Sequence, residues 1–303
     1  MTDFKTALKE LSSDVKIKEN EPLALHSTFR IGGAARYFAL PESEDQLVAV
    51  LRAAKLSGER HIIVGNGSNI LFSDDGFDGI VISTCQAKKI SVEGDKITAL
   101  CGASVIRTAI EAQKNGLSGL EFAYGIPGTV GGCVSMNAGA YGGQMSDIVI
   151  ETKYYDIEKD KILVLNNAQQ NFAYRHTVFT DHPEYAVLGS TIMLKKDDPA
   201  EIQARMNDYM SRRQEKQPLE FPSAGSVFKR PEGYFAGKLV EDCNLKGFSI
   251  GGAQVSEKHA GFIINRGNAT SKDVLCLIEH IKNTVFDRFG VMLECEVKIV
   301  GNV

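Results

Sequence analysis

The sequence predicts an α+β protein, on three observations. Apolar residues recur at helical spacing after Ser43 and again after Ser271, whereas short apolar runs typical of strands lie at 61–64 and 80–83. These patterns are mixed, without the regular βαβαβα spacing of a doubly wound sheet. The 303 residues also suffice for two or three domains, and we expect the ranges 1–85, 86–197 and 198–303 to form separate parts.

The range 1–85 begins with a polar stretch, in which we expect a peripheral helix, and continues as a strand–helix–strand unit. Ser43 is suited to cap a helix that ends at Gly58. One face of this helix is apolar, with Leu47, Val50, Leu51 and Ala54 at the required spacing. The strand expected at 61–64 then runs into a loop that begins at Gly65.

The range 86–197 is predicted to be rich in strands. We expect strands at 97–101, 148–157, 162–165 and 185–194. A helix is expected at 104–115, because Gly116 follows its last turn as a typical helix end.

The range 198–303 is predicted to contain two long helices and a final strand. Asp198 and Pro199 are typical of a helix start, and this helix ends on a basic turn near residue 216. A second helix is expected from Ser271 to just before Gly290. The stretch 291–300 alternates like a strand, with Glu294, Glu296 and Lys298 on its polar face.

Composition narrows the class of protein. The formal net charge of −4 gives no basic surface for nucleic acid, no apolar run approaches 18 residues, and the N-terminus lacks a secretory signal. We therefore expect a cytoplasmic monomer with neither nucleic-acid nor membrane partners. The six cysteines form no C-x-x-C pair and the six histidines no H-x-x-x-H pair, so we expect reduced thiols and no metal.

The segment 125–143 is the most informative stretch of the chain, because seven of its nineteen residues are glycine. Glycine is costly in regular structure and is favoured where backbone must approach a ligand closely. Backbone N–H groups in such a segment can bind phosphate oxygens. The alternative is a tight structural corner, although a corner needs only one or two glycines.

A second glycine loop, Gly65-Asn-Gly-Ser-Asn69, follows the strand at 61–64. Its Gly-x-Gly start resembles a dinucleotide fingerprint, but Ile70 replaces the third glycine, and no G-x-x-x-x-G-K-[ST] motif exists. The loop is therefore neither a Walker nor a Rossmann motif. Taken alone, Asn-Gly is also compatible with a plain turn.

Three further motifs carry side chains suited to catalysis or to substrate binding. Arg175, after Tyr174, is a fork-shaped donor suited to a carboxylate. Ser226 lies in Ala224-Gly-Ser-Val-Phe-Lys229, which does not meet the G-x-S-x-G pattern of a nucleophile elbow. Glu296 lies on the polar face of the last predicted strand. Each has a plain structural alternative: a surface pair, a turn serine and a solvated carboxylate.

Taken in order, these motifs resemble the UDP-N-acetylenolpyruvoylglucosamine reductase family (MurB), in its shorter form. The resemblance begins near Leu25, includes Asn137-Ala-Gly-Ala-Tyr-Gly142 and Leu293-Glu-Cys-Glu-Val297, and extends to the C-terminus. It implies a vanillyl-alcohol-oxidase-type FAD-binding fold of two subdomains, with a C-terminal α+β substrate domain whose last strand returns to the active site. The implied reaction is the NADPH-dependent, FAD-mediated reduction of UDP-N-acetylglucosamine enolpyruvate to UDP-N-acetylmuramate, for peptidoglycan synthesis.

The resemblance also implies roles for individual residues. The catalytic set is Arg175, Ser226 as proton donor, and Glu296, and the substrate contacts are Tyr174, Lys229 and Gln254. Arg230 stands where members of this family often carry asparagine. The residues implied to bind non-covalent FAD are Gly65, Asn66, Gly67, Ser68, Asn69, Gly125, Ile126, Pro127, Gly128, Thr129, Gly131, Gly132, Asn137, Gly139, Ala140 and Gly142.

Two rival functions stay open at the level of the sequence. One is a sugar or hydroxy-acid oxidase of the same flavoprotein superfamily. Some of those enzymes attach flavin covalently through His or Cys in the first phosphate loop, and residues 65–69 contain neither. The other is a nucleotide-sugar binding protein without catalysis, which would not need Arg175, Ser226 and Glu296 together. The basic helix end at Arg212, Arg213 and Lys216 is either a UDP-sugar anchor or a solvated helix terminus.

Overall fold

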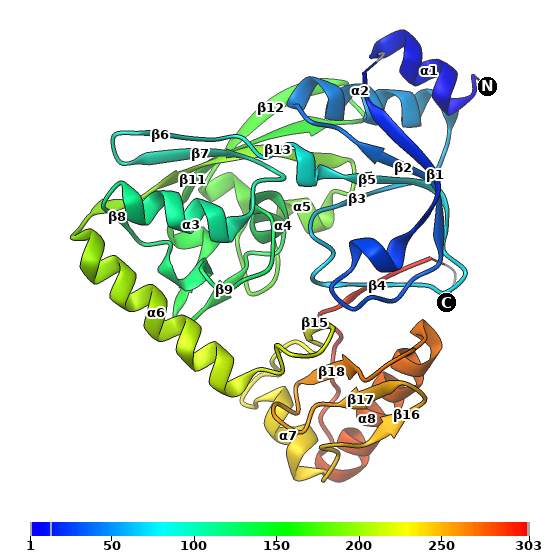
Figure 1. The fold of residues 1–303 in the computed structure, drawn as a ribbon, viewed down its shortest axis with the longest axis vertical. Coiled ribbons are helices and arrows are strands. Elements are labelled where there is room, and N and C mark those ends of the chain that lie inside the picture. Colours follow the sequence, from blue (N-terminus) through cyan, green and yellow to red (C-terminus); the bar gives the residue numbers. More distant parts are fainter. Residues whose placement is uncertain (1, 13, 302–303) are drawn as a thin grey trace. The chain divides into compact units, whose positions relative to one another are not determined.

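The computed structural model describes residues 2–12 and 14–301 and has the predicted α+β composition (Figure 1). The described chain forms two compact units, each assembled from three segments. Unit 1 combines the segments that end at residues 19, 66 and 212, and unit 2 combines 20–36, 67–78 and 213–303. How the ranges 1–85, 86–197 and 198–303 divide cofactor and substrate binding stays a prediction.

A four-stranded sheet has the strand order β1-β2-β5-β3, with β3 and β5 parallel. Its strands are β1 (Lys16–Pro22), β2 (Ala34–Leu40), β3 (His61–Val64) and β5 (Phe77–Ser83). Two helices, α1 (Phe4–Leu11) and α2 (Glu44–Ser57), pack on each other. As predicted, Ser43 caps α2 by accepting from the Gln46 N–H, and Gly58 ends it in the left-handed conformation.

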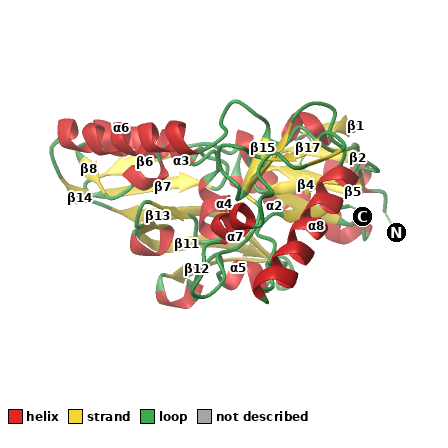
Figure 2. Ribbon diagram, turned by 90° about the horizontal axis from the view of Figure 1, so that it is seen from below, coloured by secondary structure: helices red, strands yellow, loops and turns green. Residues whose placement is uncertain are grey.

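A five-stranded antiparallel sheet in unit 1 has the order β12-β11-β13-β7-β6. Its strands are β6 (Ile90–Glu93), β7 (Lys96–Leu100), β11 (Val149–Asp156), β12 (Lys161–Asn166) and β13 (Tyr185–Met193). Against it lie α3 (Val105–Lys114) and α4 (Val130–Ser135). The long helix α6 (Pro199–Lys216) begins near the end of α3, where the Gln113 side chain donates to the Pro199 carbonyl at 3.1 Å, and runs diagonally away from it (Figures 1 and 2).

Short elements complete unit 1. Two strand pairs are β8 (Leu117–Ser118) with β14 (Lys195–Lys196), and β9 (Gly139–Ala140) with β10 (Gly143–Gln144). The short helices are α5 (Val178–Asp181), η2 (Thr84–Gln86), η3 (Glu121–Ala123), η4 (Met145–Asp147) and η5 (Ala168–Gln170). They position the connections between strands, where the glycine-rich segments lie.

Unit 2 is built on an antiparallel sheet of order β15-β18-β17-β16, covered by α8 (Ser271–Phe289) with α7 (Ala236–Asp242) beside it. Its strands are β15 (Ser223–Ser226), β16 (Ser249–Ile250), β17 (Ala253–Val255) and β18 (Phe262–Asn265), and η1 (Leu23–His26) also belongs to the unit. Thr270 and Asp273 form a capping box at the start of α8, and Gly290 ends the helix as predicted. Its apolar face, including Leu277 and Ile281, is buried.

The predicted strand at 291–300 is wrong in length. Only β19 (Lys298–Val300) is a strand, and it pairs in parallel with β4 (Ile70–Phe72). Upstream, the Glu296 N–H donates to the Val227 carbonyl at 2.8 Å, and Cys295 makes an isolated bridge with Phe228. Because the segment changes partner near residue 297, the expected alternation breaks: Ile299 is 40% exposed and Val300 is buried.

Among the described residues, no helix is long and apolar enough to cross a membrane.

Candidate functional site

Unit 1 brings the two glycine loops together although they are about 60 residues apart. The Asn66 side-chain amide donates to the Pro127 carbonyl at 2.9 Å. A Cβ atom on Gly65 would lie only 2.4 Å from the Thr129 hydroxyl oxygen, so the backbone fits there only without a side chain. The start of the first loop therefore lies against the centre of the second.

The second loop is fastened to the connection between β7 and α3. The Gly131 N–H donates to the Cys101 carbonyl, and the Val105 N–H donates to the Gly128 carbonyl, at 2.8 and 3.1 Å. Thr129 caps α4 by accepting from the Gly132 N–H at 3.3 Å. Gly132 itself is exposed, so this fastened loop presents backbone at its surface.

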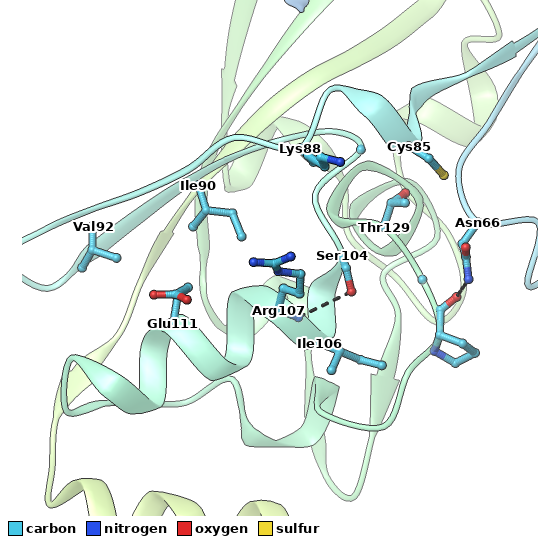
Figure 3. A pocket seen from close by; sticks show the side chains of 13 residues that line it. Asn66, Cys85, Lys88, Ile90, Val92, Ser104, Ile106, Arg107, Glu111 and Thr129 are labelled. Atoms are coloured by element: carbon cyan, nitrogen blue, oxygen red, sulfur yellow. Dashed lines mark hydrogen bonds between the residues drawn. The ribbon is translucent and has the colours of Figure 1, made fainter. Parts of the chain in front are cut away.

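A pocket of about 530 Å³ opens beside these loops, within the size range of small-molecule sites (Figure 3). Figure 3 shows Asn66 and Thr129 toward one end of the pocket and Val92 and Glu111 toward the other. The further side chains that the figure labels along the lining are Cys85, Lys88, Ile90, Ser104, Ile106 and Arg107. Apolar walls with a few polar and cationic groups suit an aromatic ring that carries a sugar and phosphates.

Cys85 is the one thiol among the described residues that line the pocket. Burial raises the pKa of this thiol above its ordinary value. The thiol therefore stays neutral at physiological pH, which makes it a poor nucleophile toward a bound ligand.

Arg175 lies against the hairpin that follows α4 in sequence. Its guanidinium donates to the carbonyls of Asn137 and Gly139 at 3.4 and 3.3 Å. The buried Asn137 amide donates to the Ala173 carbonyl at 3.0 Å and accepts from the Ser146 N–H. The Asn137 side chain thus ties the hairpin to the segment that carries Arg175. Next to Arg175, the predicted substrate residue Tyr174 is 52% exposed.

Unit 2 joins three predicted site segments. The Asn69 side-chain amide donates to the Glu296 carbonyl at 3.1 Å, and the Glu296 N–H donates to the carbonyl of Val227. Ser226 directly precedes Val227 at the end of β15 and is exposed. The end of the first glycine loop, the serine motif and the C-terminal segment therefore converge on one hydrogen-bonded framework.

The last three residues of the first glycine loop, Gly67, Ser68 and Asn69, have different environments. Gly67 has φ +62°, and a Cβ atom there would lie 2.1 Å from the His26 carbonyl. Ser68 is partly buried between Gly67 and Asn69. The Asn69 carbonyl accepts from the Lys298 N–H at 3.0 Å, at the junction with β19.

The predicted substrate residues of unit 2 are held by neighbours. Lys229 forms an ion pair with Glu294. The Gln254 amide donates to the Gly247 carbonyl and to the Ser249 hydroxyl, both at 3.0 Å.

Arg230 is held in a different way from Lys229 and Gln254. Its guanidinium lies 3.9 Å from the centre of the Phe235 ring, and its Nε donates to the Tyr234 carbonyl at 3.3 Å. Arginine at position 230, in place of the asparagine that members of the resembled family often carry, thus places a cation on an aromatic surface.

Of the pocket residues, the sequence predicted Asn66 and Pro127–Thr129 as cofactor contacts, but it missed the rest of the lining and a buried carboxylate, Glu121. Ser104 could have been found as the N-cap of α3, because it precedes a clear amphipathic helix. Lys88 and Arg107 carry no sequence signal, since isolated surface cations are common. Glu121 is 7% exposed and is bound by Arg205, which lies 84 residues away, so no local pattern reveals it.

Glycine loops from two sequence-distant places, with a pocket of small-molecule size beside them in an α+β fold, are features expected of an FAD-dependent oxidoreductase. Two family models match the chain: an FAD binding domain over residues 35–166, and the UDP-N-acetylenolpyruvoylglucosamine reductase C-terminal domain over residues 217–300. The fold and the cofactor predicted from the sequence are thereby confirmed.

Relatives and a solved structure agree over nearly the whole chain. The chain is 48% identical to the UDP-N-acetylenolpyruvoylglucosamine reductase of Caldanaerobacter subterraneus subsp. tengcongensis, over 97% of each protein. It is 44% identical to that of Clostridium novyi, over 99% of this chain and 97% of the relative. The crystal structure of the Thermus caldophilus enzyme (MurB) matches with a TM-score of 0.80 and 31% identity, over 95% of this chain and 99% of that one. The chain belongs to the UDP-N-acetylenolpyruvoylglucosamine reductase family.

Proposed function

We propose that the protein reduces UDP-N-acetylglucosamine enolpyruvate to UDP-N-acetylmuramate with NADPH and FAD, in peptidoglycan precursor synthesis. The observation that carries this proposal is the likeness to named reductases over 97% of the chain. Likeness over that length, including both the FAD-binding part and the C-terminal part, favours the reductase over the oxidase and the non-catalytic binding protein.

The residues present fit FAD. The pocket beside Asn66 and Pro127–Thr129 has room for the adenosine part, and the first glycine loop would supply backbone N–H groups for the diphosphate. Most N–H groups of segment 125–132 already donate within the protein, so this segment would contribute close backbone contact instead. The hairpin residues Asn137, Gly139, Ala140 and Gly142 complete the proposed cofactor set. The neutral Cys85 thiol, with neither His nor Cys at residues 65–69, supports non-covalent binding.

The proposed chemistry divides the double-bond reduction between a hydride and a proton. The chemistry that bound FAD would supply is hydride transfer, from NADPH to the terminal carbon of the enolpyruvyl group. The Ser226 hydroxyl donates a proton to the carbon beside the carboxylate and regains it from solvent, so that one hydride and one proton together add two hydrogen atoms across the double bond. Free serine is a weak acid, and neighbouring groups must therefore assist this transfer.

Negative charge develops on the enolpyruvyl carboxylate before the proton arrives, and preorganised donors must meet it there. Arg175 is proposed for this role, because a guanidinium suits a carboxylate. Glu296 is proposed as its catalytic partner, either protonated or holding the guanidinium in place. The hydrogen bonds of the Glu296 backbone with Asn69 and Val227 support a fixed position for the backbone that carries this side chain.

Tyr174, Lys229 and Gln254 are the proposed contacts of the UDP-sugar. The ion pair of Lys229 with Glu294 would hold the ammonium in place until a phosphate competes for it. Arg230 is a further cation within this motif, held on Phe235. We also propose that the enzyme is cytoplasmic and monomeric, and sedimentation at micromolar concentration tests the monomeric state.

The test is an assay of the purified protein with its visible spectrum. We expect a yellow protein whose flavin is released on acid precipitation, and NADPH consumption that requires the enolpyruvyl sugar. A colourless protein that does not take up FAD would contradict the proposal. Sugar oxidation driven by oxygen, without NADPH consumption, would favour the oxidase instead.

A further inference from the structure

One face of α6 faces two glycine-rich segments of unit 1, which are segment 125–132 and the β9–β10 hairpin. Arg205 and Tyr209 are four residues apart and so lie on the same side of the helix. Arg205 binds the residues before segment 125–132, and Tyr209 contacts the turn of the β9–β10 hairpin. Neither contact is part of the proposed catalytic set.

The first contact is a charged network around Glu121. Arg205 donates to one Glu121 carboxylate oxygen through two nitrogens, at 2.9 and 3.1 Å, and also binds Asp197 at 2.5 Å. The other Glu121 oxygen accepts from the Gly119 N–H at 2.7 Å. The Glu121 side chain is only 8% exposed, so losing its cation would leave a buried charge held only by hydrogen bonds from Gly119 and Ser118.

This network lies directly before segment 125–132 in the sequence. Glu121 begins η3, which ends at Ala123, two residues before Gly125. The Ala123 carbonyl then accepts from the Ile126 N–H at 3.0 Å, which links η3 to the Ile-Pro-Gly turn. The ring of Phe122, also in η3, occupies the space a Cβ atom on Gly143 would need. A shift of η3 would therefore move both segments.

The second contact is an aromatic stack. The rings of Tyr141 and Tyr209 lie 4.7 Å apart and 7° from parallel. Tyr141 has φ +53° and Gly142 has φ +87°, so both central residues of this hairpin turn are left-handed. A bulky residue rarely adopts this conformation, and such outliers persist only where surrounding contacts hold them. The same hairpin provides the Gly139 carbonyl that Arg175 binds.

We propose that Arg205 and Tyr209 are positioning residues that hold the two glycine-rich segments in the shape that binds FAD. The inference rests on the proposed function, because it takes these segments as the flavin site. It assigns α6 the role of a brace for the cofactor site, in addition to leading the chain toward the C-terminal region.

The test of Tyr209 is the Kd of the apoprotein for FAD, measured by the quenching of flavin fluorescence on binding. The chain contains no tryptophan. Removing the stack in Tyr209→Ala is expected to raise the Kd for FAD by about tenfold and to shift the flavin absorption band near 450 nm. Tyr209→Phe keeps the stack and should stay within about twofold of the parent protein. Tyr141→Ala should match Tyr209→Ala, and the double variant should be no weaker than either.

The test of Arg205 uses a conservative variant and a matched control. Arg205→Lys keeps the charge but not the fork that binds two partners, so we expect a Kd for FAD raised about fivefold. Arg52→Met removes a more exposed arginine–carboxylate pair elsewhere in unit 1, Arg52 with Asp160 at 2.6 Å, and should leave the Kd unchanged. Arg205→Met, where it folds, should exceed the effect of Arg205→Lys.

The outcomes separate this inference from the proposed function. If the parent protein binds FAD but Tyr209→Ala and Arg205→Lys keep its Kd and flavin spectrum, α6 is not a brace and the function stands. The same holds if these variants only lower the apoprotein melting temperature, or if Arg52→Met weakens FAD equally. A parent protein that does not bind FAD would contradict both proposals.

Discussion

Gly132→Ala tests whether the exposed backbone of segment 125–132 contacts the cofactor. Gly132 lies in the first turn of α4, and an added methyl group would meet only the Thr129 hydroxyl oxygen, at 3.4 Å. Alanine in a helix is favoured over glycine by about 0.5–1 kcal/mol. The apoprotein should therefore become slightly more stable, with a melting temperature higher by roughly 1–3 °C.

FAD binding should change in the opposite direction. If flavin or diphosphate lies against Gly132, the methyl group overfills a packed contact, which costs about 1–3 kcal/mol. The Kd for FAD should then rise by roughly 5- to 150-fold. A gain in apoprotein stability together with a loss of cofactor affinity is difficult to explain by general damage to the fold.

Gly131→Ala is the matched comparison in the same helix. Its methyl group would lie 2.8 Å from the Cys101 Cβ atom, so the protein itself must shift and the apoprotein melting temperature should fall. Differential scanning fluorimetry of both apoproteins and FAD titration by fluorescence provide the measurements. Normal FAD retention and turnover in Gly132→Ala would refute the placement of the cofactor against this segment.

Three further predictions concern individual side chains. Ser226→Ala should leave flavin reduction by NADPH intact and nearly abolish reduction of the enolpyruvyl substrate, as measured by stopped flow; unchanged turnover would exclude Ser226 as proton donor. Arg175→Ala should keep FAD while turnover falls by orders of magnitude, and a loss of less than about tenfold would argue against charge stabilisation. Burial opposes ionisation of Glu121, but hydrogen bonds from Gly119, Arg205 and Ser118 outweigh it and hold the pKa of this carboxyl below its ordinary value of 4.5. The ionised carboxylate therefore stabilises the fold fully above pH 4.5, and this stabilisation is lost as the pH falls through the lowered pKa. Below about pH 4.5, the melting temperature of Glu121→Gln should depend less on pH than that of the parent protein. An equal pH dependence in the two proteins would count against the network.

The sequence predicted the elements with strong local signals. The caps at Ser43 and Gly290 and the apolar faces of α2 and α8 are local patterns, and the structure has them as predicted. The strand at 291–300 was overpredicted, because alternation alone does not reveal where a segment changes partner. Its hydrogen bonds pass from Val227 to Asn69, and neither partner is near it in sequence.

The candidate site was predictable in part. Glycine density and motif order identified the loops and, through family resemblance, the cofactor, because backbone approach to phosphate demands particular residue types. The contact of Asn66 with Pro127 and the pocket beside it depend on tertiary packing of distant segments. The same limit applies to Arg205 and Tyr209, because the sequence places them on a helix but does not show that η3 and the hairpin lie against that helix.

The most direct test of the central claim is an anaerobic titration followed at the flavin absorption band. One equivalent of NADPH should bleach the bound FAD, and one equivalent of UDP-N-acetylglucosamine enolpyruvate should then restore the oxidised spectrum, with a sugar product heavier by two hydrogens. Flavin that stays reduced after the substrate is added, and regains its colour only on admission of oxygen, would contradict assignment of the protein as an enolpyruvyl reductase.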